Sequence, residues 1–142
     1  MTRLSEVIQL SVFIANESGR VSEVTKGLGE AGINIRGFSV SDTADYGILR
    51  LIVDKPAEAH EVLKNAGFTV KETGVICVDL PDHPGGLASV LKIVSEAGVN
   101  IEYVYSLIGT YVVLNVAHTG RAMALLKDRP VRIVTQEEIA AG

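Results

Sequence analysis

The sequence is poor in cysteine and in aromatic residues. It has one cysteine (Cys77), no tryptophan and 5% aromatic residues among its 142 positions. A single cysteine excludes a disulfide within the chain and leaves no Cys-x-x-Cys pair for zinc, so the expected compartment is the cytoplasm. The scarcity of aromatic side chains argues against a surface that stacks on nucleic-acid bases.

The chain also lacks a basic excess and a long apolar run. Its 13 Lys and Arg are scattered among 17 Asp and Glu, giving a net charge of −4, whereas nucleic-acid binders carry basic patches. No apolar run approaches the length of a membrane-spanning helix, and the N-terminal segment has no signal-peptide pattern. We therefore expect a cytoplasmic protein that binds neither nucleic acid nor a membrane.

Motifs for catalysis and metal binding are missing as well. No nucleophile elbow, phosphate-binding loop or paired-carboxylate pattern is present. The three histidines, His60, His83 and His118, have no partner at metal-ligand spacing. Cys77 lies on the alternate face of a predicted strand, where we interpret it as a small packed residue and not as a nucleophile. We expect no metal, no cofactor and no catalytic residue.

One glycine motif is typical of a cofactor site. Gly27, Gly29 and Gly32 have the G-x-G-x-x-G spacing of a dinucleotide-binding loop, with Asp54 about twenty residues further on. Such a loop follows a strand directly and opens a helix, but a predicted helix starting around Gly19 already occupies that place. Gly32 is therefore interpreted as the residue that ends this helix, and no dinucleotide site is predicted.

The sequence does contain an internal repeat. Residues 16–35 align without a gap on residues 82–101. Gly19 falls on Gly85, and the tripeptide Glu-Ala-Gly ending at residue 32 falls on the same tripeptide ending at residue 98. We interpret the chain as two copies of one unit, residues 1–72 and residues 73–142.

The hydrophobic periodicity of each copy predicts six elements, namely four strands and two helices. Strands are predicted at 7–14, 33–42, 46–54 and 68–73 in the first copy, and at 74–80, 99–108, 110–118 and 131–136 in the second. Helices are predicted from around Gly19 and at 56–67, then after residue 85 and at 119–128, with Thr119 as an N-cap.

The order β-α-β-β-α-β, found twice, predicts an α+β fold. Each copy would be a ferredoxin-like unit, with an antiparallel four-stranded sheet and two helices on one face. Because one sheet face and the sheet edges remain uncovered, we expect the units to associate within the chain and then between chains, as a homodimer.

The turns after the first strands carry a family resemblance. Residues 15–19 (ANESG) and 81–85 (PDHPG) each precede a helix that ends in EAG and continues into INI or VNI. This turn, helix and Gly-Ile/Val-Asn-Ile step resemble the ACT domain family over nearly the whole chain. Two positions depart from the family pattern, because Ser18 stands where proline is commoner and Asp82 where asparagine is usual.

The resemblance implies a module that binds a small molecule, most often an amino acid, between two ACT units. The turn of one unit would meet the start of the second strand of a neighbouring unit. A helix N-terminus opened by glycine suits a carboxylate, and an asparagine amide can bind both a carboxylate and an ammonium. The expected ligand-binding residues are Asn16, Gly19 and Asn34 in the first copy and Asp82, His83, Gly85 and Asn100 in the second.

Other interpretations stay open for these features. Asn34 and Asn100 could serve only to stabilise a turn, and Tyr103 and Tyr105 are interpreted as interface packing. The leading hypothesis is a non-catalytic protein that regulates a partner enzyme or a pathway of amino acid metabolism allosterically. The alternatives are an ACT-like scaffold without a ligand and a small enzyme on a ferredoxin-like fold, for which Arg20 beside the first turn is a faint hint.

Overall fold

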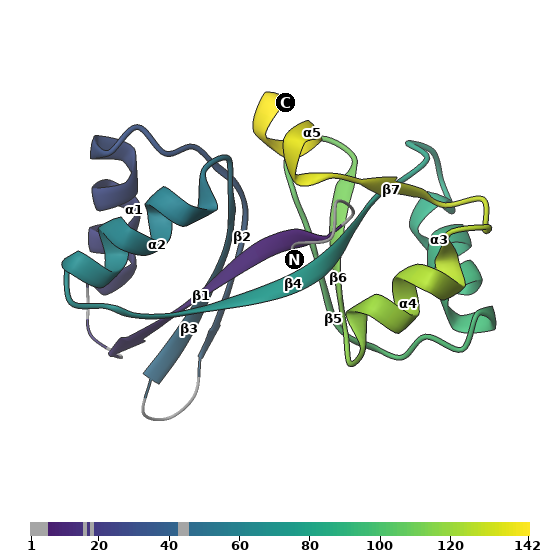
Figure 1. Cartoon of the computed structure of the whole chain (residues 1–142), viewed down its shortest axis with the longest axis horizontal. Coiled ribbons are helices and arrows are strands. Elements are labelled where there is room, and N and C mark those ends of the chain that lie inside the picture. The colour runs from purple at the N-terminus through teal and green to yellow at the C-terminus, as the bar shows by residue number, and fades with distance from the viewer. Residues whose placement is uncertain (1–5, 16, 18, 43–45) are drawn as a thin grey trace. The chain divides into compact units, whose positions relative to one another are not determined.

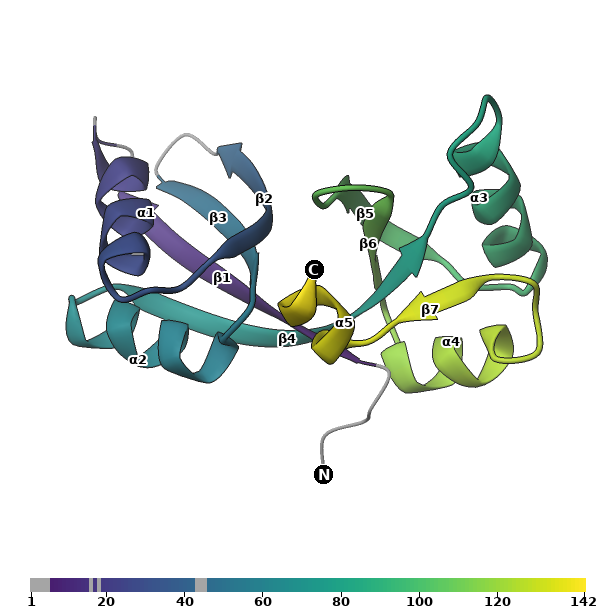
Figure 2. The same cartoon turned by 90° about the horizontal axis from the view of Figure 1, so that it is seen from above.

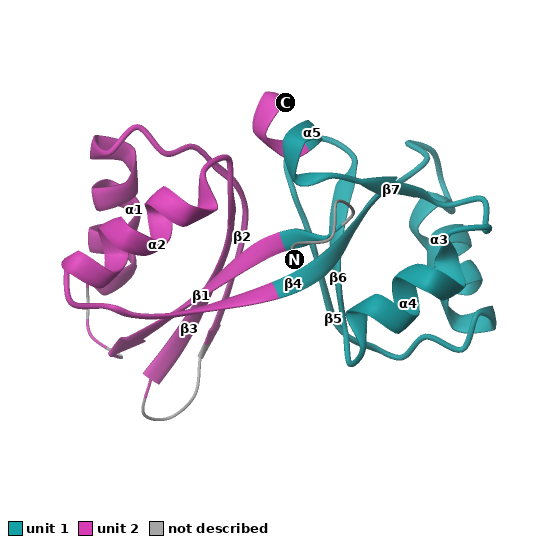
Figure 3. Ribbon diagram, viewed as in Figure 1, with its two compact units in different colours: residues 1–7, 74–138 teal, residues 8–73, 139–142 magenta. Residues whose placement is uncertain are grey.

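The structure is a computed structural model that describes residues 6–15, 17, 19–42 and 46–142. They form two compact units, shown in Figure 3. The first repeat contains residues 8–73 with 139–142 (magenta), and the second repeat contains residues 74–138 with Glu6 and Val7 (teal).

The first repeat has the predicted order of elements (Figure 1). It comprises β1 (Val7–Ala15), α1 (Arg20–Glu30), β2 (Ile35–Asp42), β3 (Tyr46–Val53), α2 (Pro56–Asn65) and the beginning of β4 (Thr69–Asp79). The strand order is β2-β3-β1-β4, and β3 pairs antiparallel with both β1 and β2. Strand β2 is therefore an edge strand.

The core of the first repeat lies between its helices and one face of its sheet. Alternate residues of β1 and β3 point into this layer because side chains on a strand alternate between faces. Both α1 and α2 supply residues from one stripe, and Figure 2 shows the two helices on the same side of the sheet. The buried members are Leu10, Val12, Ile14, Val24, Leu28, Ile33, Leu49, Leu51, Val53, Ala59, Leu63 and Phe68.

The second repeat is built in the same way. After β4 come α3 (Gly86–Glu96), β5 (Ile101–Ser106), β6 (Tyr111–Val116), α4 (Thr119–Leu126) and β7 (Arg132–Val134). Helix α5 (Gln136–Ala141) follows, and its residues from Ile139 onward belong to the first repeat. The strand order is β5-β6-β4-β7, and its three pairings are antiparallel. Its core contains Ile76, Val78, Val90, Val94, Val112, Leu114, Val116, Ala122 and Leu126. The prediction of two ferredoxin-like units is confirmed.

Two local predictions are wrong. Residues 68–73 and 74–80 were predicted as separate strands, but β4 is continuous because no turn interrupts it at Gly74. Thr119 is not the N-cap of α4, because that position belongs to His118. The Thr119 hydroxyl instead donates to the Gly74 carbonyl at 3.1 Å, a tertiary partner from β4.

Helix α5 was not predicted at all. A capping box starts it, since the Glu138 N–H donates to the Thr135 hydroxyl at 3.2 Å and the Thr135 N–H donates to Glu138 Oε1 at 3.2 Å. The Thr-x-x-Glu spacing of residues 135–138 is the sequence signal that could have identified this helix.

Candidate ligand-binding site

The turn that opens the first helix of each repeat contains a left-handed glycine. Gly19 precedes α1 with a φ of 88°, and Gly85 precedes α3 with a φ of 86°. Residues with a Cβ are strained in this backbone conformation, so both positions favour glycine. No side chain among the described residues caps either helix. The first N–H of each helix, from Arg20 and from Gly86, donates to a turn carbonyl, that of Glu17 and that of His83. The N–H groups that follow in the first turn are therefore those suited to an anion.

The turn of the second repeat also holds the other predicted residues of this half of the site. Asp82 and His83 are both exposed. The His83 N–H donates to the Pro81 carbonyl at 3.0 Å, and its Nδ1 lies 3.0 Å from the Pro84 carbonyl oxygen. His83 therefore helps to hold the turn. The corresponding asparagine of the first repeat, Asn16, lies outside the described residues.

The step from helix to second strand holds the remaining predicted residues. Asn34 precedes β2 and Asn100 precedes β5, and both are exposed. The Asn34 N–H donates to Asp54 Oδ1 at 2.9 Å, and the Asp54 N–H donates to the Asn34 carbonyl at 3.1 Å. These two bonds close the step of the first repeat.

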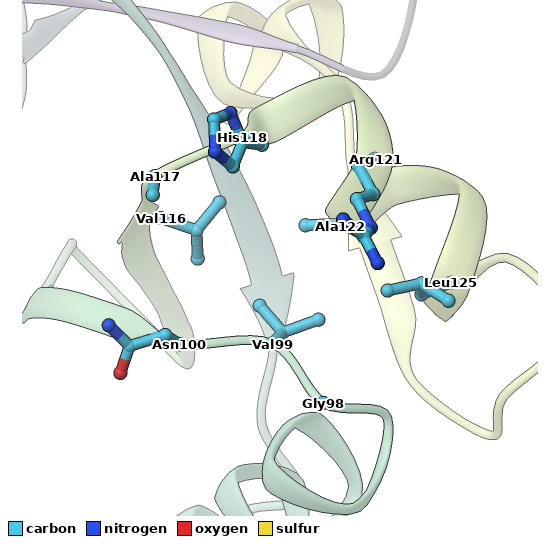
Figure 4. A pocket seen from close by; sticks show the side chains of 9 residues that line it. All are labelled: Gly98, Val99, Asn100, Val116, Ala117, His118, Arg121, Ala122 and Leu125. Carbon is cyan, nitrogen blue, oxygen red and sulfur yellow. The ribbon is translucent and has the colours of Figure 1, made fainter.

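The step of the second repeat lines a cavity of about 180 Å³. Figure 4 shows the amide of Asn100 pointing away from this space, whereas Val99 and Leu125 point toward it. His118 and Arg121, from the start of α4, stand at its border (Figure 4). This cavity and the Asn100 amide therefore lie on different sides of the chain.

The two halves of the predicted site lie at opposite ends of a helix within each repeat. Helices α1 and α3 have 11 residues each, which corresponds to a length of about 16 Å. Gly85 lies before the first turn of α3, and Asn100 lies beyond its last turn. One repeat alone thus does not bring its own turn and step together around a small ligand.

A second cavity, of about 260 Å³, lies beside the turn of the second repeat. Its lining comprises Asp79, Leu80, Pro81, Ser89, Val90, Ile93, Pro130, Val131 and Arg132. Arg132 is already paired with Asp79 at 3.1 Å and with Glu138. A hydrogen bond with Tyr111 and the charge of Glu138 raise the pKa of Arg132. The guanidinium is therefore charged, and it already has two acidic partners.

The residues with other interpretations also have clear positions. Cys77 is fully buried on β4, and burial, followed by the charges of Asp79 and Glu138, raises the pKa of its thiol to about 12. A thiol of that pKa is not a nucleophile at neutral pH. The rings of Tyr103 and Tyr105 stack on β5 with their centroids 6.3 Å apart.

Sequence reasoning missed three residues beside the predicted site. His118 and Arg121 reach the step cavity from α4, and no local motif connects them with Asn100 in the sequence. Gly86 is buried, and a Cβ there would lie 2.0 Å from the Pro81 carbonyl oxygen. The consecutive glycines at 85 and 86 were the available signal for this close approach.

Within the described residues, no group of three or more His, Cys, Asp or Glu could hold a metal ion. In the same part of the chain, no helix is both long and apolar enough to cross a membrane.

The comparison with protein families decides the identity of the fold. Residues 5–141 match the family described as an ACT domain pair. The chain belongs to the ACT domain family. The ACT fold is a regulatory fold, and the resemblance carried by the two turns is confirmed. No curated protein is significantly similar to this ACT domain pair in sequence.

Solved structures with the same fold include one of clear sequence similarity. Protein BT0572 from Bacteroides thetaiotaomicron is 36% identical with a TM-score of 0.89, and the alignment covers 96% of each chain. The ligand-free regulatory subunit of aspartate kinase from Thermus thermophilus has a TM-score of 0.63 at 20% identity, covering 86% of this chain and 89% of that one. The subunit from Thermus flavus has a TM-score of 0.57 at 17% identity, with 86% and 91% covered.

Proposed function

We propose that this ACT domain pair binds an amino acid or a related small metabolite and regulates a partner enzyme or pathway through that binding. The observation that carries the proposal is the left-handed glycine before α1 and before α3, with φ angles of 88° and 86°. Each precedes a helix N-terminus with no side-chain cap among the described residues, which suits a carboxylate. An exposed asparagine follows each helix, and its amide suits both charged groups of an amino acid.

The complete site needs two ACT units, because turn and step lie at opposite ends of one helix. A second copy of the chain would supply the missing half. Edge strand β2 supports this expectation, since its Phe38 and Val40 are 64% and 53% exposed. Exposed apolar side chains on an edge strand favour pairing with another sheet, so we expect a homodimer.

Regulation in trans is the role that the relatives support. The aspartate kinase proteins of this fold are regulatory subunits by name. Their sequence identity to this chain is too low to carry over a ligand or a partner. A ligand would regulate by binding one arrangement of the units more tightly than another.

Thermal unfolding with each of the twenty amino acids at millimolar concentration tests the proposal. A ligand present at about 100 times its Kd stabilises the folded state by about 2.7 kcal/mol, which corresponds to a melting shift of several degrees. Asn34→Ala and Asn100→Ala identify the repeat that binds, because each removes one step amide. Asn65→Ala, at the exposed end of α2, is the matched control and should keep the full shift.

The main alternative is a scaffold that assembles without a ligand. The exposed Asp82 favours it, because its carboxylate stands in the turn where a ligand carboxylate would approach. A flat melting temperature across the whole panel, combined with a stable dimer in sedimentation, would support the scaffold and reject amino-acid sensing.

A further inference from the structure

The register of the sheets shows which residues of the two repeats correspond beyond the third strand of each unit. Leu10 on β1 pairs with Leu51 on β3, and Ile76 on β4 pairs with Leu114 on β6. Extending the gap-free alignment of the repeats back by six residues places Ile76 on Leu10, so Leu114 is the counterpart of Leu51. Later positions of the two repeats are matched by counting onward from this pair.

This correspondence places Ala117 where the first repeat has Asp54. In the first repeat, the Asp54 carboxylate accepts the N–H of Asn34 at 2.9 Å. The second repeat has no carboxylate at this position, and within the described part of the chain the Asn100 N–H has no hydrogen-bond partner. The first repeat thus supplies a carboxylate of its own to the backbone N–H of its step, and the second repeat lacks this carboxylate.

One charge beside the two positions is reversed, because Arg121 is the counterpart of Glu58. His118 is the counterpart of Lys55. Arg121 is exposed, and among the described residues it has neither an ion pair nor a hydrogen bond. No acidic side chain lines the cavity of about 180 Å³ beside it. The missing carboxylate therefore coincides with an unpaired guanidinium, which binds carboxylates well.

The remainder of the cavity is apolar. Val99, Val116, Ala122 and Leu125 line it between the step and α4 (Figure 4). Leu125 is 38% exposed, so an aliphatic group bound there would cover apolar surface that now faces water. An acidic partner for an ammonium group is absent from the lining residues.

We propose that this cavity in the second repeat binds a small monocarboxylate with a short aliphatic chain. The ligand carboxylate occupies the place that Asp54 fills in the first repeat. It accepts a hydrogen bond from the backbone N–H of Asn100 and forms an ion pair with Arg121, while its aliphatic chain packs against Val99 and Leu125. The site goes beyond the proposed amino-acid site, because the side-chain amide of Asn100 points away from the cavity and no acidic side chain lines the cavity to pair with an ammonium.

Titration with 3-methylbutanoate, followed by calorimetry and by amide chemical shifts, tests this proposal. For a ligand of this size we expect a Kd on the order of a millimolar. The uncharged 3-methylbutanamide has the same shape and should bind roughly tenfold more weakly or worse, since it cannot pair with the guanidinium. Leucine should also bind more weakly at this cavity, because its ammonium finds no acidic partner.

Two variants copy the first repeat into the second. Ala117→Asp supplies the carboxylate internally, and Arg121→Glu introduces the acid found at Glu58. Each should weaken 3-methylbutanoate binding by roughly tenfold or more, through occupation of the site or charge repulsion. Both residues are exposed, and circular dichroism verifies that the variants fold. Arg129→Glu, an equal charge change at an exposed residue outside the cavity, is the control and should bind normally.

Four results would overturn the carboxylate pocket. Failure of 3-methylbutanoate to bind, equal binding of the amide, or unchanged affinity in Ala117→Asp would each overturn the carboxylate pocket. Loss of binding in Arg129→Glu to the same extent would reduce the effect to net charge and reject the pocket as well. The titration does not depend on the amino-acid site, because 3-methylbutanoate lacks an ammonium, so either proposal can fail while the other stands.

Discussion

The two repeats share a backbone framework and differ in the side chains around it. The glycines before α1 and α3 have φ angles of 88° and 86°, and the glycines after these helices, Gly32 and Gly98, have φ angles of 75° and 79°. The backbone hydrogen bonds of the two turns also correspond, with an N–H from the turn donating to Ala15 in one repeat and to Pro81 in the other. The duplication thus preserved the glycine conformations and this hydrogen bond, while Asp82 and His83 stand in the second turn where the first has Asn16 and Glu17.

The first helical residue illustrates this divergence. Arg20 begins α1, where its guanidinium lies 4.7 Å from the centroid of the Phe68 ring and pairs with Glu23 at 2.7 Å. Gly86 begins α3, and the carbonyl of Pro81 lies where a Cβ would be. The first helical residue thus packs a large side chain against Phe68 in one repeat, and it lies directly against the Pro81 backbone in the other.

The largest expected effect comes from disrupting the close contact between Gly86 and the Pro81 carbonyl at the start of α3. Gly86→Ala places a Cβ 2.0 Å from the Pro81 carbonyl oxygen, so the turn must shift. We expect a loss of roughly 2–3 kcal/mol in the free energy of unfolding, measured by urea denaturation.

Gly29→Ala in α1 provides the matched control for this substitution. Nothing lies within 4 Å of a Cβ at Gly29, so this variant should gain up to about 1 kcal/mol from helix propensity. A loss in Gly86→Ala no larger than about 0.5 kcal/mol, within the range of ordinary surface changes, would show that the turn relaxes freely.

The next effect is a pH dependence of the free energy of unfolding. It distinguishes Cys77 from Ser11, its counterpart in the first repeat. Burial raises the pKa of the Cys77 thiol to about 12, whereas the thiol of an unfolded chain ionises near pH 9. The folded state therefore keeps its full stability below pH 9 and loses about 1.4 kcal/mol per pH unit between pH 9 and 12. Near pH 10.5 the loss should be about 2 kcal/mol.

The free energy of unfolding between pH 7 and 10.5 measures this effect. The difference between wild type and Cys77→Ala removes the contribution of the other titrating groups, and the variant should show the shallower slope. Ser11→Ala, which removes no ionisable group, should leave the slope as it is. Parallel curves for wild type and Cys77→Ala would mean that the thiol is accessible to water.

Much of the fold could be predicted because its signals are local and occur twice. Helix-ending glycines, alternating strands and the proline at the start of α2 each depend on the backbone near one residue. Thr119 was misassigned because its hydroxyl bonds to Gly74, which is distant in the sequence. The continuity of β4 across Gly74 likewise depends on strand pairing, which periodicity does not encode.

The candidate site could be predicted less completely for the same reason. Gly19 and Gly85 follow from turn geometry, since a left-handed residue before a helix is visible as a repeated glycine. Arg121 and His118 approach Asn100 from α4, and only the sheet register shows that Arg121 replaces an acid of the first repeat. The charge reversal between the repeats therefore appears after the strands are aligned in space.

The smallest expected effect comes from exchanging the residues Asp54 and Ala117, which correspond to each other beside the helix-to-strand steps of the two repeats. Asp54→Ala removes the carboxylate that accepts the Asn34 N–H at 2.9 Å, and it should cost about 1 kcal/mol because the half-buried site lets water replace part of the bond. Ala117→Asp makes the reverse change in the second repeat. It should gain up to about 1 kcal/mol, because the new carboxylate can accept the Asn100 N–H and lies near Arg121.

Urea denaturation of the two single variants and the double variant measures this exchange. The two changes lie in separate repeats and share no partner, so their effects should add to nearly zero in the double variant. The gain from Ala117→Asp should also shrink in about 1 M NaCl, which screens its attraction to Arg121, while the loss from Asp54→Ala changes less. Destabilisation by Ala117→Asp would mean that the second repeat has no place for a carboxylate, and it would count against ligand binding at the same cavity.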